Sequence, residues 1–277
     1  MARGDAPSDA ARGEVRPALI TLTTDFGHKD PFVGEMKGVI LSINPLARVV
    51  DITHGVGPHD VAEAALVIGD SHGYFPRATV HVVVVDPGVG SGRRPILAEA
   101  DGHFFVGPDN GVFTEVLRAA GARPRLWHIR EERYFLRKGG PTFHGRDVFA
   151  PVAAWLSRGT APEDFGPEVR QWAEIHLPVP EASEDGVSGE VALIDRFGNA
   201  ITNIREKDLG RLQGGGPVRV LVKGRELSLK GFYSEAGDRE PHALVNSNGR
   251  LEVFVYMGSA AAELDIKRGD KVFVAGP

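Results

Sequence analysis

Apolar strand-like segments alternate with helical segments over more than half of the chain, and this alternation constrains the fold more than any other feature. Residues 18–24 and 48–52 are β-branched and apolar, whereas apolar residues recur at helical spacing in 32–41 and 60–69. Residues 79–85 are apolar almost throughout, which is typical of a strand covered on both faces. The pattern predicts an α/β domain with a largely parallel central sheet.

The sequence changes character after about Trp172. Residues 177–186 carry two prolines and a polar cluster, as interdomain linkers do. Short strand-like runs follow, separated by glycine or Asn-Gly turns, and they predict a smaller all-β domain, a sandwich or a barrel. We therefore expect four parts: a disordered tail over 1–16, the α/β domain over 17–176, a linker over 177–188 and a barrel-like β domain over 189–277.

Composition excludes several classes of protein. The formal net charge is -5 with no long run of either sign, which argues against a nucleic-acid binder. There is no cysteine, so disulfides and thiolate metal sites are excluded. No apolar stretch approaches the roughly 20 residues needed to cross a bilayer, and the N-terminal residues lack the apolar core of a signal peptide. We expect a cytoplasmic protein with no membrane or nucleic-acid partner.

A glycine-rich loop follows the buried strand 79–85 and reads Asp86-Pro-Gly-Val-Gly-Ser-Gly-Arg-Arg94. Three glycines let the backbone turn tightly or approach a ligand. The Walker phosphate-binding pattern is absent, because no Lys-Ser or Lys-Thr follows the glycines. The loop could bring Asp86 and Arg93 together, and such a pair holds the carboxylate ionised and oriented. The alternative is a structural salt bridge that closes a loop.

Two further candidate segments lie in the α/β domain. Asp25 and Asp30 follow the first strand, and ligands gather beyond the carboxyl ends of strands in open α/β sheets. Asp25 could accept two hydrogen bonds from a ribose diol, or it could cap the next helix. His144 lies in a glycine-bearing loop before a helix and could act as an acid or base, since its pKa is near neutrality. The alternative is a packing His with Asp147 as the helix N-cap.

The β domain contains asparagines at turns. Asp195 and Asn199 lie at a strand-to-turn junction, and an Asn side chain offers a donor and an acceptor together, which suits the edge of an adenine. The alternative is a β-turn that uses Gly198-Asn199. The same choice applies to 246–249.

A metal centre is another alternative, because several His and Asp residues stand on predicted loops. None of them forms a recognised ligand motif such as His-Glu-x-x-His. The residues concerned are Asp25, His28, Asp30, His54, His59, Asp60, Asp86, His144 and Asp147.

Taken together, these segments resemble the S-adenosyl-L-methionine hydroxide adenosyltransferase family, which is related to the enzymes that join fluoride or chloride to the 5′-carbon of the same substrate. The resemblance covers nearly the whole chain after the tail, and seven motifs in order make it specific. They are Thr-Thr-Asp-Phe-Gly (Asp25), Val-Gly-Glu-Met-Lys-Gly (Lys37), Asp-Pro-Gly-Val-Gly with Arg93-Arg94, Gly-Pro-Asp-Asn-Gly (Asp109), Phe-His-Gly-Arg-Asp (His144), Asp-Arg-Phe-Gly-Asn (Asn199) and Asn-Ser-Asn-Gly (Ser247).

The resemblance implies a homotrimer, with substrate bound between the N-terminal domain of one subunit and the C-terminal domain of its neighbour. It implies no metal and no cofactor, since S-adenosylmethionine is the substrate. The family's catalytic acid, arginine and histidine fall on Asp86, Arg93 and His144. In the halogenating relatives tyrosines stand at the positions of Asp86 and His144, and a serine stands at that of Gly145. The sequence therefore favours water over halide.

The resemblance also assigns substrate contacts. The ribose-binding carboxylate falls on Asp25, with Asp30 nearby, and the adenine and methionine contacts fall on residues of the C-terminal domain. These later residues are Asp195, Asn199, Phe232, Ser247 and the backbone around Met257.

The expected reaction is hydrolysis of S-adenosylmethionine to adenosine and L-methionine, by in-line attack of an activated water on the 5′-carbon. Either Asp86 or His144 could take the proton from the water. A halogenase, a metal-dependent hydrolase and a non-catalytic binder of S-adenosylmethionine or adenosine are the alternative functions.

Overall fold

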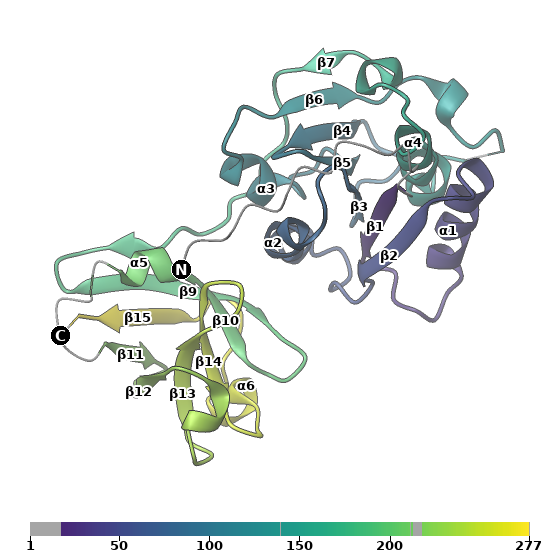
Figure 1. Cartoon of the computed structure of the whole chain (residues 1–277). Helices are drawn as coiled ribbons and strands as arrows, with labels where there is room; N and C mark the ends of the chain where they lie inside the picture. The colour runs from purple at the N-terminus through teal and green to yellow at the C-terminus, as the bar shows by residue number, and fades with distance from the viewer. Residues whose placement is uncertain (1–17, 139, 211, 213–217, 277) are drawn as a thin grey trace, which may run out of the picture. The chain divides into compact units, whose positions relative to one another are not determined.

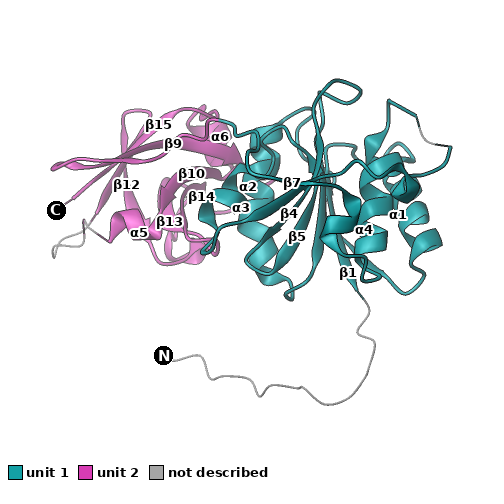
Figure 2. Ribbon diagram, turned by 90° about the horizontal axis from the view of Figure 1, so that it is seen from above, with its two compact units in different colours: residues 1–175 teal, residues 176–277 magenta. Residues whose placement is uncertain are grey.

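The computed structural model describes residues 18–138, 140–210, 212 and 218–276. The predicted tail over 1–16 lies outside the described residues. The chain divides into two compact units, one up to Ile175 and one from His176, which Figure 2 colours separately. In the described residues no helix is both long enough and apolar enough to cross a membrane.

A seven-stranded sheet forms the centre of the first unit, in the order β2-β1-β3-β5-β4-β6-β7 (Figure 1). The first four strands in that order pair in parallel, which confirms the predicted α/β class for the half of the sheet that carries the candidate site. They are β2 (Arg48–Thr53), β1 (Leu19–Thr24), β3 (Val80–Val84) and β5 (His103–Pro108).

The other half of the sheet is antiparallel, which strand–helix alternation does not predict. Its strands are β4 (Pro95–Ala100), β6 (Arg125–His128) and β7 (Glu168–Val169). The change begins where Asp101 and Gly102 join β4 to β5 in a two-residue turn, both with positive φ. An Asp-Gly pair is the strongest short-range signal of such a hairpin, because both turn positions require φ above zero.

Helices cover both faces of the sheet (Figure 1). One apolar core joins the sheet to α1 (Phe32–Ile43) and α4 (Ala150–Leu156), and a second joins it to α2 (Val61–Ser71) and α3 (Thr114–Ala119). A π-helical turn, η3 (Gly145–Phe149), leads directly into α4. The 3₁₀ turns of this unit are η1 (His72–Tyr74), η2 (Glu132–Tyr134) and η4 (Pro162–Phe165).

The second unit is a seven-stranded β-barrel, which confirms the predicted β class and settles the choice between sandwich and barrel. The barrel closes because β10 pairs with both β14 and β9, and its core is apolar. Its strands are β9 (Gly186–Ile194), β10 (Ala200–Arg205), β11 (Arg219–Val222), β12 (Arg225–Lys230), β13 (Pro241–Val245), β14 (Arg250–Val255) and β15 (Lys271–Ala275).

Short elements decorate the barrel: α5 (Glu206–Leu209), η5 (Tyr233–Glu235) and α6 (Ala260–Glu263). The segment 177–188, expected to be a linker, contains β8 (Glu181–Ala182), which pairs with the first residues of β9. The chain therefore joins the barrel sheet within a few residues of the division between the units.

Candidate active site

The loop between β3 and β4 folds back on itself at the carboxyl edge of the sheet. The Val89 N–H donates to the Asp86 carbonyl at 3.2 Å, and the Ser91 N–H donates to the Gly88 carbonyl at 3.0 Å. Gly90 has φ of +79°, and a Cβ there would lie 3.1 Å from the Pro141 carbonyl oxygen. Glycine is required at this position, because other residues rarely adopt this conformation.

This turn brings together two residues that the sequence paired only as a possibility. Arg93 Nε donates to Asp86 Oδ1 at 2.9 Å, and Arg93 Nη2 donates to Asp86 Oδ2. The two side chains are only 8% and 6% exposed, so the pair is almost completely removed from water. A bidentate pair of this kind orients the carboxylate and keeps it ionised.

His144 joins the pair from a segment 51 residues further along the chain. Its Nδ1 lies 2.7 Å from Arg93 Nη2, and since a guanidinium only donates, Nδ1 must be the acceptor. The imidazole is therefore neutral, with its proton on Nε2. Burial lowers the pKa of His144 below its usual value, and the positive charge of Arg93 lowers it further.

A cavity of about 320 Å³ lies in front of these residues. Asp25, Asp86 and His144 line it, whereas Arg93 lies behind them and is not part of its wall. The remaining wall is mostly apolar and consists of Phe26, Phe32, Pro58, His59, Val84, Val89, Thr142, Phe143 and Gly145. A small, largely apolar cavity with a few polar groups is typical of a ligand site.

Asp25 and Asp30 differ in their placement. Asp25 lies beyond β1, and its Oδ2 accepts the backbone N–H of His59 at 2.8 Å, so it does not cap α1. Asp30 is exposed in the turn before α1 and does not line the cavity. Only Asp25 of the two therefore faces the same cavity as Asp86.

Three phenylalanines in the cavity wall were not recognised as site residues from the sequence. Phe26, Phe32 and Phe143 contact one another edge to face, with ring centroids 5.3 to 5.7 Å apart. Phe26 and Phe143 belong to motifs that the sequence singled out. An apolar residue inside a motif looks like a core residue, so the sequence carries no signal that these rings line a cavity.

The barrel unit holds Asp195 and Asn199 in one tight turn between β9 and β10. Asp195 Oδ1 accepts the backbone N–H groups of Phe197 and Asn199, each at 2.8 Å, and Oδ2 accepts Asn199 Nδ2 at 3.0 Å. Asn199 is buried, while Phe197 is 75% exposed. The segment therefore forms a turn, as the alternative interpretation of the sequence has it, and this turn orients the Asn199 side-chain amide.

The other predicted contacts of the barrel unit lie on separate loops. Phe232 and Met257 are 61% and 79% exposed, and Met257 has φ of +54°. Ser247 lies in the turn between β13 and β14.

A buried carboxylate, Glu252, connects two of these loops, and no motif or spacing in the sequence singles it out. Its Oε1 accepts the Tyr233 hydroxyl at 2.7 Å, and its Oε2 accepts Asn246 Nδ2 at 3.0 Å. Burial raises the pKa of Glu252. Tyr233 follows Phe232 and Asn246 precedes Ser247, so Glu252 holds the two predicted contact loops together.

Four of the His and Asp residues considered for a metal centre, Asp25, His59, Asp86 and His144, line the cavity, and the others lie outside its wall. Among residues 18–138, 140–210, 212 and 218–276, no three His, Asp or Glu side chains gather in an arrangement that could hold a metal ion. His54 instead lies 3.1 Å from Asp51, which also binds Lys37 at 2.6 Å, and its Nδ1 lies 2.8 Å from the Thr24 hydroxyl.

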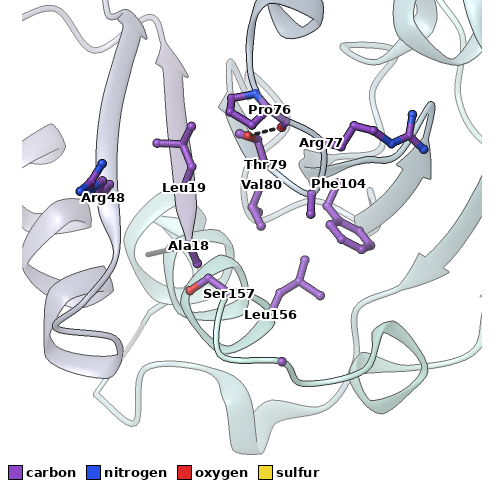
Figure 3. A pocket seen from close by; sticks show the side chains of 12 residues that line it. Ala18, Leu19, Arg48, Pro76, Arg77, Thr79, Val80, Phe104, Leu156 and Ser157 are labelled. Atoms are coloured by element: carbon purple, nitrogen blue, oxygen red, sulfur yellow. Dashed lines mark hydrogen bonds between the residues drawn. The ribbon is translucent and has the colours of Figure 1, made fainter. Parts of the chain in front are cut away.

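A second cavity, of about 590 Å³, lies where the parallel strands begin (Figure 3). Leu19 and Val80 line it, and the Thr79 hydroxyl already donates to the Pro76 carbonyl at 2.7 Å. The cavity carries no carboxylate and no imidazole. Ligands of open α/β sheets bind at the carboxyl ends of the strands, so the smaller cavity is the stronger candidate.

Comparison with known proteins identifies relatives along almost the whole chain. The family model described as the SAM hydroxide adenosyltransferase N-terminal domain matches residues 20–166, and the model of the C-terminal domain matches residues 189–273. The (R)-S-adenosyl-L-methionine hydrolase of Thermus thermophilus is 38% identical over 256 residues, which cover 90% of this chain and 96% of that protein. A fluorinase of Actinoplanes sp. is 28% identical over 292 residues, covering 92% and 97%.

The fold has a close counterpart among solved structures. The crystal structure of an uncharacterized conserved protein from Thermotoga maritima matches with a TM-score of 0.87 at 36% identity, covering 92% of this chain and 99% of that one. Both domain models match in the expected order, and the resemblance drawn from seven motifs is thereby confirmed. The chain belongs to the SAM hydroxide adenosyltransferase family.

Proposed function

We propose that this protein hydrolyses S-adenosyl-L-methionine to adenosine and L-methionine. The observation that carries the proposal is the Asp86 carboxylate, held by Arg93 beside a neutral His144 and facing a small apolar cavity. Four curated relatives at 35–38% identity are named (R)-S-adenosyl-L-methionine hydrolase. We extend to this chain both the reaction and the R configuration at the sulfonium that those names specify.

The reaction requires a water to attack in line with the departing sulfur. A C5′–O bond forms, the C5′–S bond breaks, and the sulfur takes the bonding electron pair and leaves as the neutral thioether of methionine. The leaving group therefore needs no acid. The nucleophile is the difficulty, because free water is a very weak acid and attacks slowly unless a base removes its proton.

Asp86 is the group we assign to accept the proton of the water. His144 Nδ1 already accepts from Arg93, and its Nε2 carries a proton, so neither nitrogen is free to accept another. Asp86 is ionised and lines the cavity, while the Nε2–H of His144 can donate a hydrogen bond that orients the water. General base catalysis contributes roughly 10²–10⁴-fold. Alignment of the water with the C–S bond supplies much of the rest.

Substrate recognition is shared between the two units in this proposal. Asp25 binds the ribose hydroxyls, because its carboxylate faces the cavity that holds Asp86. The barrel residues bind the adenine and methionine parts, and they are Asp195, Asn199, Phe232, Ser247 and the backbone at Met257. Asp30 keeps only a peripheral role, since it does not line the cavity.

We further propose a cytoplasmic homotrimer in which the site is completed between neighbouring subunits, without a metal or cofactor. Phe197, Phe232 and Met257 are exposed in this chain, and such an assembly would have to cover those of them that contact the substrate. Light scattering tests the trimer, and metal analysis with a chelator-treated assay tests the absence of metal. A monomer, or activity lost to the chelator and restored by a metal, would contradict these points.

A halogenase is the alternative function, because fluorinases are among the relatives of this chain. Two features of the cavity favour water over halide as the nucleophile. Asp86 and His144 form a base and a donor, as hydrolysis needs, and Gly145 has no room for a larger residue. A Cβ at Gly145 would lie 2.9 Å from the Phe143 ring, so the serine of the halogenating relatives would have to displace that ring.

One experiment separates these functions. The purified protein is incubated with each resolved sulfonium epimer of S-adenosylmethionine, with and without chloride or fluoride, and the products are separated by chromatography. We expect adenosine and methionine from the R epimer, in amounts that halide does not change. A 5′-halo product would establish the halogenase, and tight binding without any product would establish a binding protein.

A further inference from the structure

The Gly-Pro-Asp-Asn-Gly motif has no role in the chemistry described above, yet it occupies a special position. In the sheet order β3-β5-β4, strand β5 lies between the strand that precedes the Asp86 loop and the strand that follows it. β5 is parallel to β3 and antiparallel to β4, so its last residues lie between the two ends of the loop. Asp109 and Asn110 directly follow β5.

Asn110 holds the first end of the loop. Its Nδ2 donates to the backbone carbonyl of Val85 at 2.9 Å, and Val85 directly precedes Asp86. The orientation of the Asn110 amide is fixed, because its Oδ1 accepts the backbone N–H of Val112 at 3.2 Å.

Asp109 holds the second end of the loop. Arg94 directly follows Arg93, and its Nε donates to Asp109 Oδ2 at 2.8 Å. The Asp109 backbone N–H donates to the Arg94 carbonyl, also at 2.8 Å. Asp109 Oδ1 accepts the Ala173 backbone N–H at 2.7 Å, so the same carboxylate, whose side chain is only 5% exposed, is anchored to a third segment.

We propose that Asp109 and Asn110 are positioning residues that fix both ends of the loop and so set the geometry of Asp86 and Arg93. Neither lines the cavity, so they act on the reaction only through the loop. This inference rests on the proposed hydrolysis. A displacement of about 1 Å at reacting groups can cost on the order of 100-fold in rate, so a loosened loop should lower turnover much more than it weakens substrate binding.

Two nearly isosteric variants release one end each. Asn110→Asp keeps the acceptor for Val112 but places an anionic oxygen against the Val85 carbonyl. Asp109→Asn keeps an acceptor for Ala173 but places an NH₂ group against Arg94. Since the protein is otherwise unchanged, these variants test the loop rather than the cavity.

The matched control is Glu174→Gln, the same type of carboxylate-to-amide change in an ion pair of the same unit. Glu174 binds Arg118 at 2.7 Å, and both side chains are well exposed, at 37% and 44%. We expect this control to keep kcat and KM within about twofold of wild type, because exposed pairs contribute little.

We expect each loop variant to lower kcat by about 10- to 100-fold, with KM within about threefold of wild type. Adding Arg94→Gln to Asp109→Asn should cost less activity than the sum of the two single changes, because both remove the Arg94–Asp109 contact, while Arg94→Gln also removes the hydrogen bond from Arg94 to the Gln171 carbonyl. Hydrogen exchange gives a readout that needs no activity. The amides of residues 88–93 should exchange faster in both loop variants than in wild type and in the control.

The outcomes separate the two proposals. If the wild-type protein releases no adenosine, the proposed function fails. Hydrogen exchange of residues 88–93 then remains as the test of whether Asp109 and Asn110 fix the loop. If wild type is active and the loop variants keep kcat within twofold and normal exchange, the positioning role is wrong. A rise in KM at constant kcat would also overturn it. If the variants lose kcat only in proportion to unfolded protein, measured by thermal unfolding, the two residues are merely structural and the inference fails.

Discussion

The two units hold their candidate site residues in opposite ways. In the α/β unit, Asp86 and Arg93 are nearly inaccessible to water and bind each other, and His144 completes a network of charge-assisted hydrogen bonds. In the barrel unit, Phe232 and Met257 extend into solvent from loops, and the turn at Asn199 and the buried Glu252 are the best-anchored parts of the candidate region.

The difference assigns a different task to each unit. A base must be held at one distance from the reacting atoms, so its supports are built into the fold before substrate arrives. A binding surface needs shape and hydrogen-bond partners, and it can remain open until it is covered. We therefore expect changes in the α/β unit to act on kcat and changes in the barrel unit to act on KM.

The largest effect should come from Asp86→Asn. This variant keeps the size of the side chain but removes the proton acceptor, so kcat should fall by about 10²–10⁴-fold. Calorimetric titration should still find substrate bound within a fewfold of the wild-type affinity. Normal turnover by this variant would remove Asp86 from the mechanism.

Acidification should destabilise the α/β unit over several pH units. Burial lowers the pKa of His81 to about 3, and His103 and His72 lie beside it. A histidine with a lowered pKa binds a proton more readily when unfolded, so stability is complete above about pH 6.5 and falls toward pH 3. The slope for one such group is about 1.4 kcal/mol per pH unit.

Chemical denaturation at a series of pH values measures this slope, and His81→Gln should flatten it. The matched control is His176→Gln, at an exposed histidine, which should leave the slope unchanged. Glu252 in the barrel should act in the opposite direction: its pKa is raised, so its contribution improves as the pH falls through that pKa. Equal pH dependence in wild type and His81→Gln would refute the assignment.

A smaller effect is expected from Asn199→Ala. Loss of one or two hydrogen bonds to the adenine should raise KM about tenfold while kcat stays within about twofold. Asn203→Ala is the comparison, because the Asn203 side chain binds only the backbone of Glu190 and Pro178. That variant should lower the unfolding temperature and leave KM unchanged. An unchanged KM for Asn199→Ala would disprove the adenine contact.

The smallest effect concerns the acid limb of the pH profile. Burial and Arg93 lower the pKa of His144, so the imidazole stays neutral down to and below about pH 6.5. The value of kcat should be level from pH 8 to 6.5 and should decline only at lower pH, where a protonated His144 loses its hydrogen bond from Arg93. His144→Gln should be slower, but without this decline. A wild-type limb centred above pH 7 would contradict the neutral imidazole.

Sequence patterns gave the elements of the α/β unit more reliably than their connections. Helix α1 ends at Ile43 with Asn44 as its C-cap, directly before Pro45, as predicted from the Asn-Pro pair, and the buried segment 79–85 contains β3. The antiparallel half of the sheet was missed because β4 and β5 follow each other with no helix between them, and the Asp101-Gly102 turn that signals this hairpin was not recognised. The pattern within a segment predicts whether that segment is a helix or a strand, and it does not predict which strands pair.

The candidate site was predictable in part for the same reason. The pairing of Asp86 with Arg93 closes a short loop, so the sequence could suggest it. The approach of His144 from 51 residues away depends on how α4 packs on the sheet, and only the family resemblance pointed to it. Glu252 was invisible, because a glutamate inside a strand carries no sign of burial or partners.

Hydrolysis in water enriched in ¹⁸O tests the central claim most directly, because it reports where the attacking oxygen goes. Products from S-adenosylmethionine are separated and weighed by mass spectrometry, for wild type and for Asp86→Asn. We expect one ¹⁸O in the 5′-hydroxyl of adenosine, none in methionine, and almost no product from the variant. Two results would contradict attack at the 5′-carbon by a water that Asp86 activates. One is label in a product of the methionine chain, and the other is formation of labelled adenosine at equal rates by wild type and Asp86→Asn.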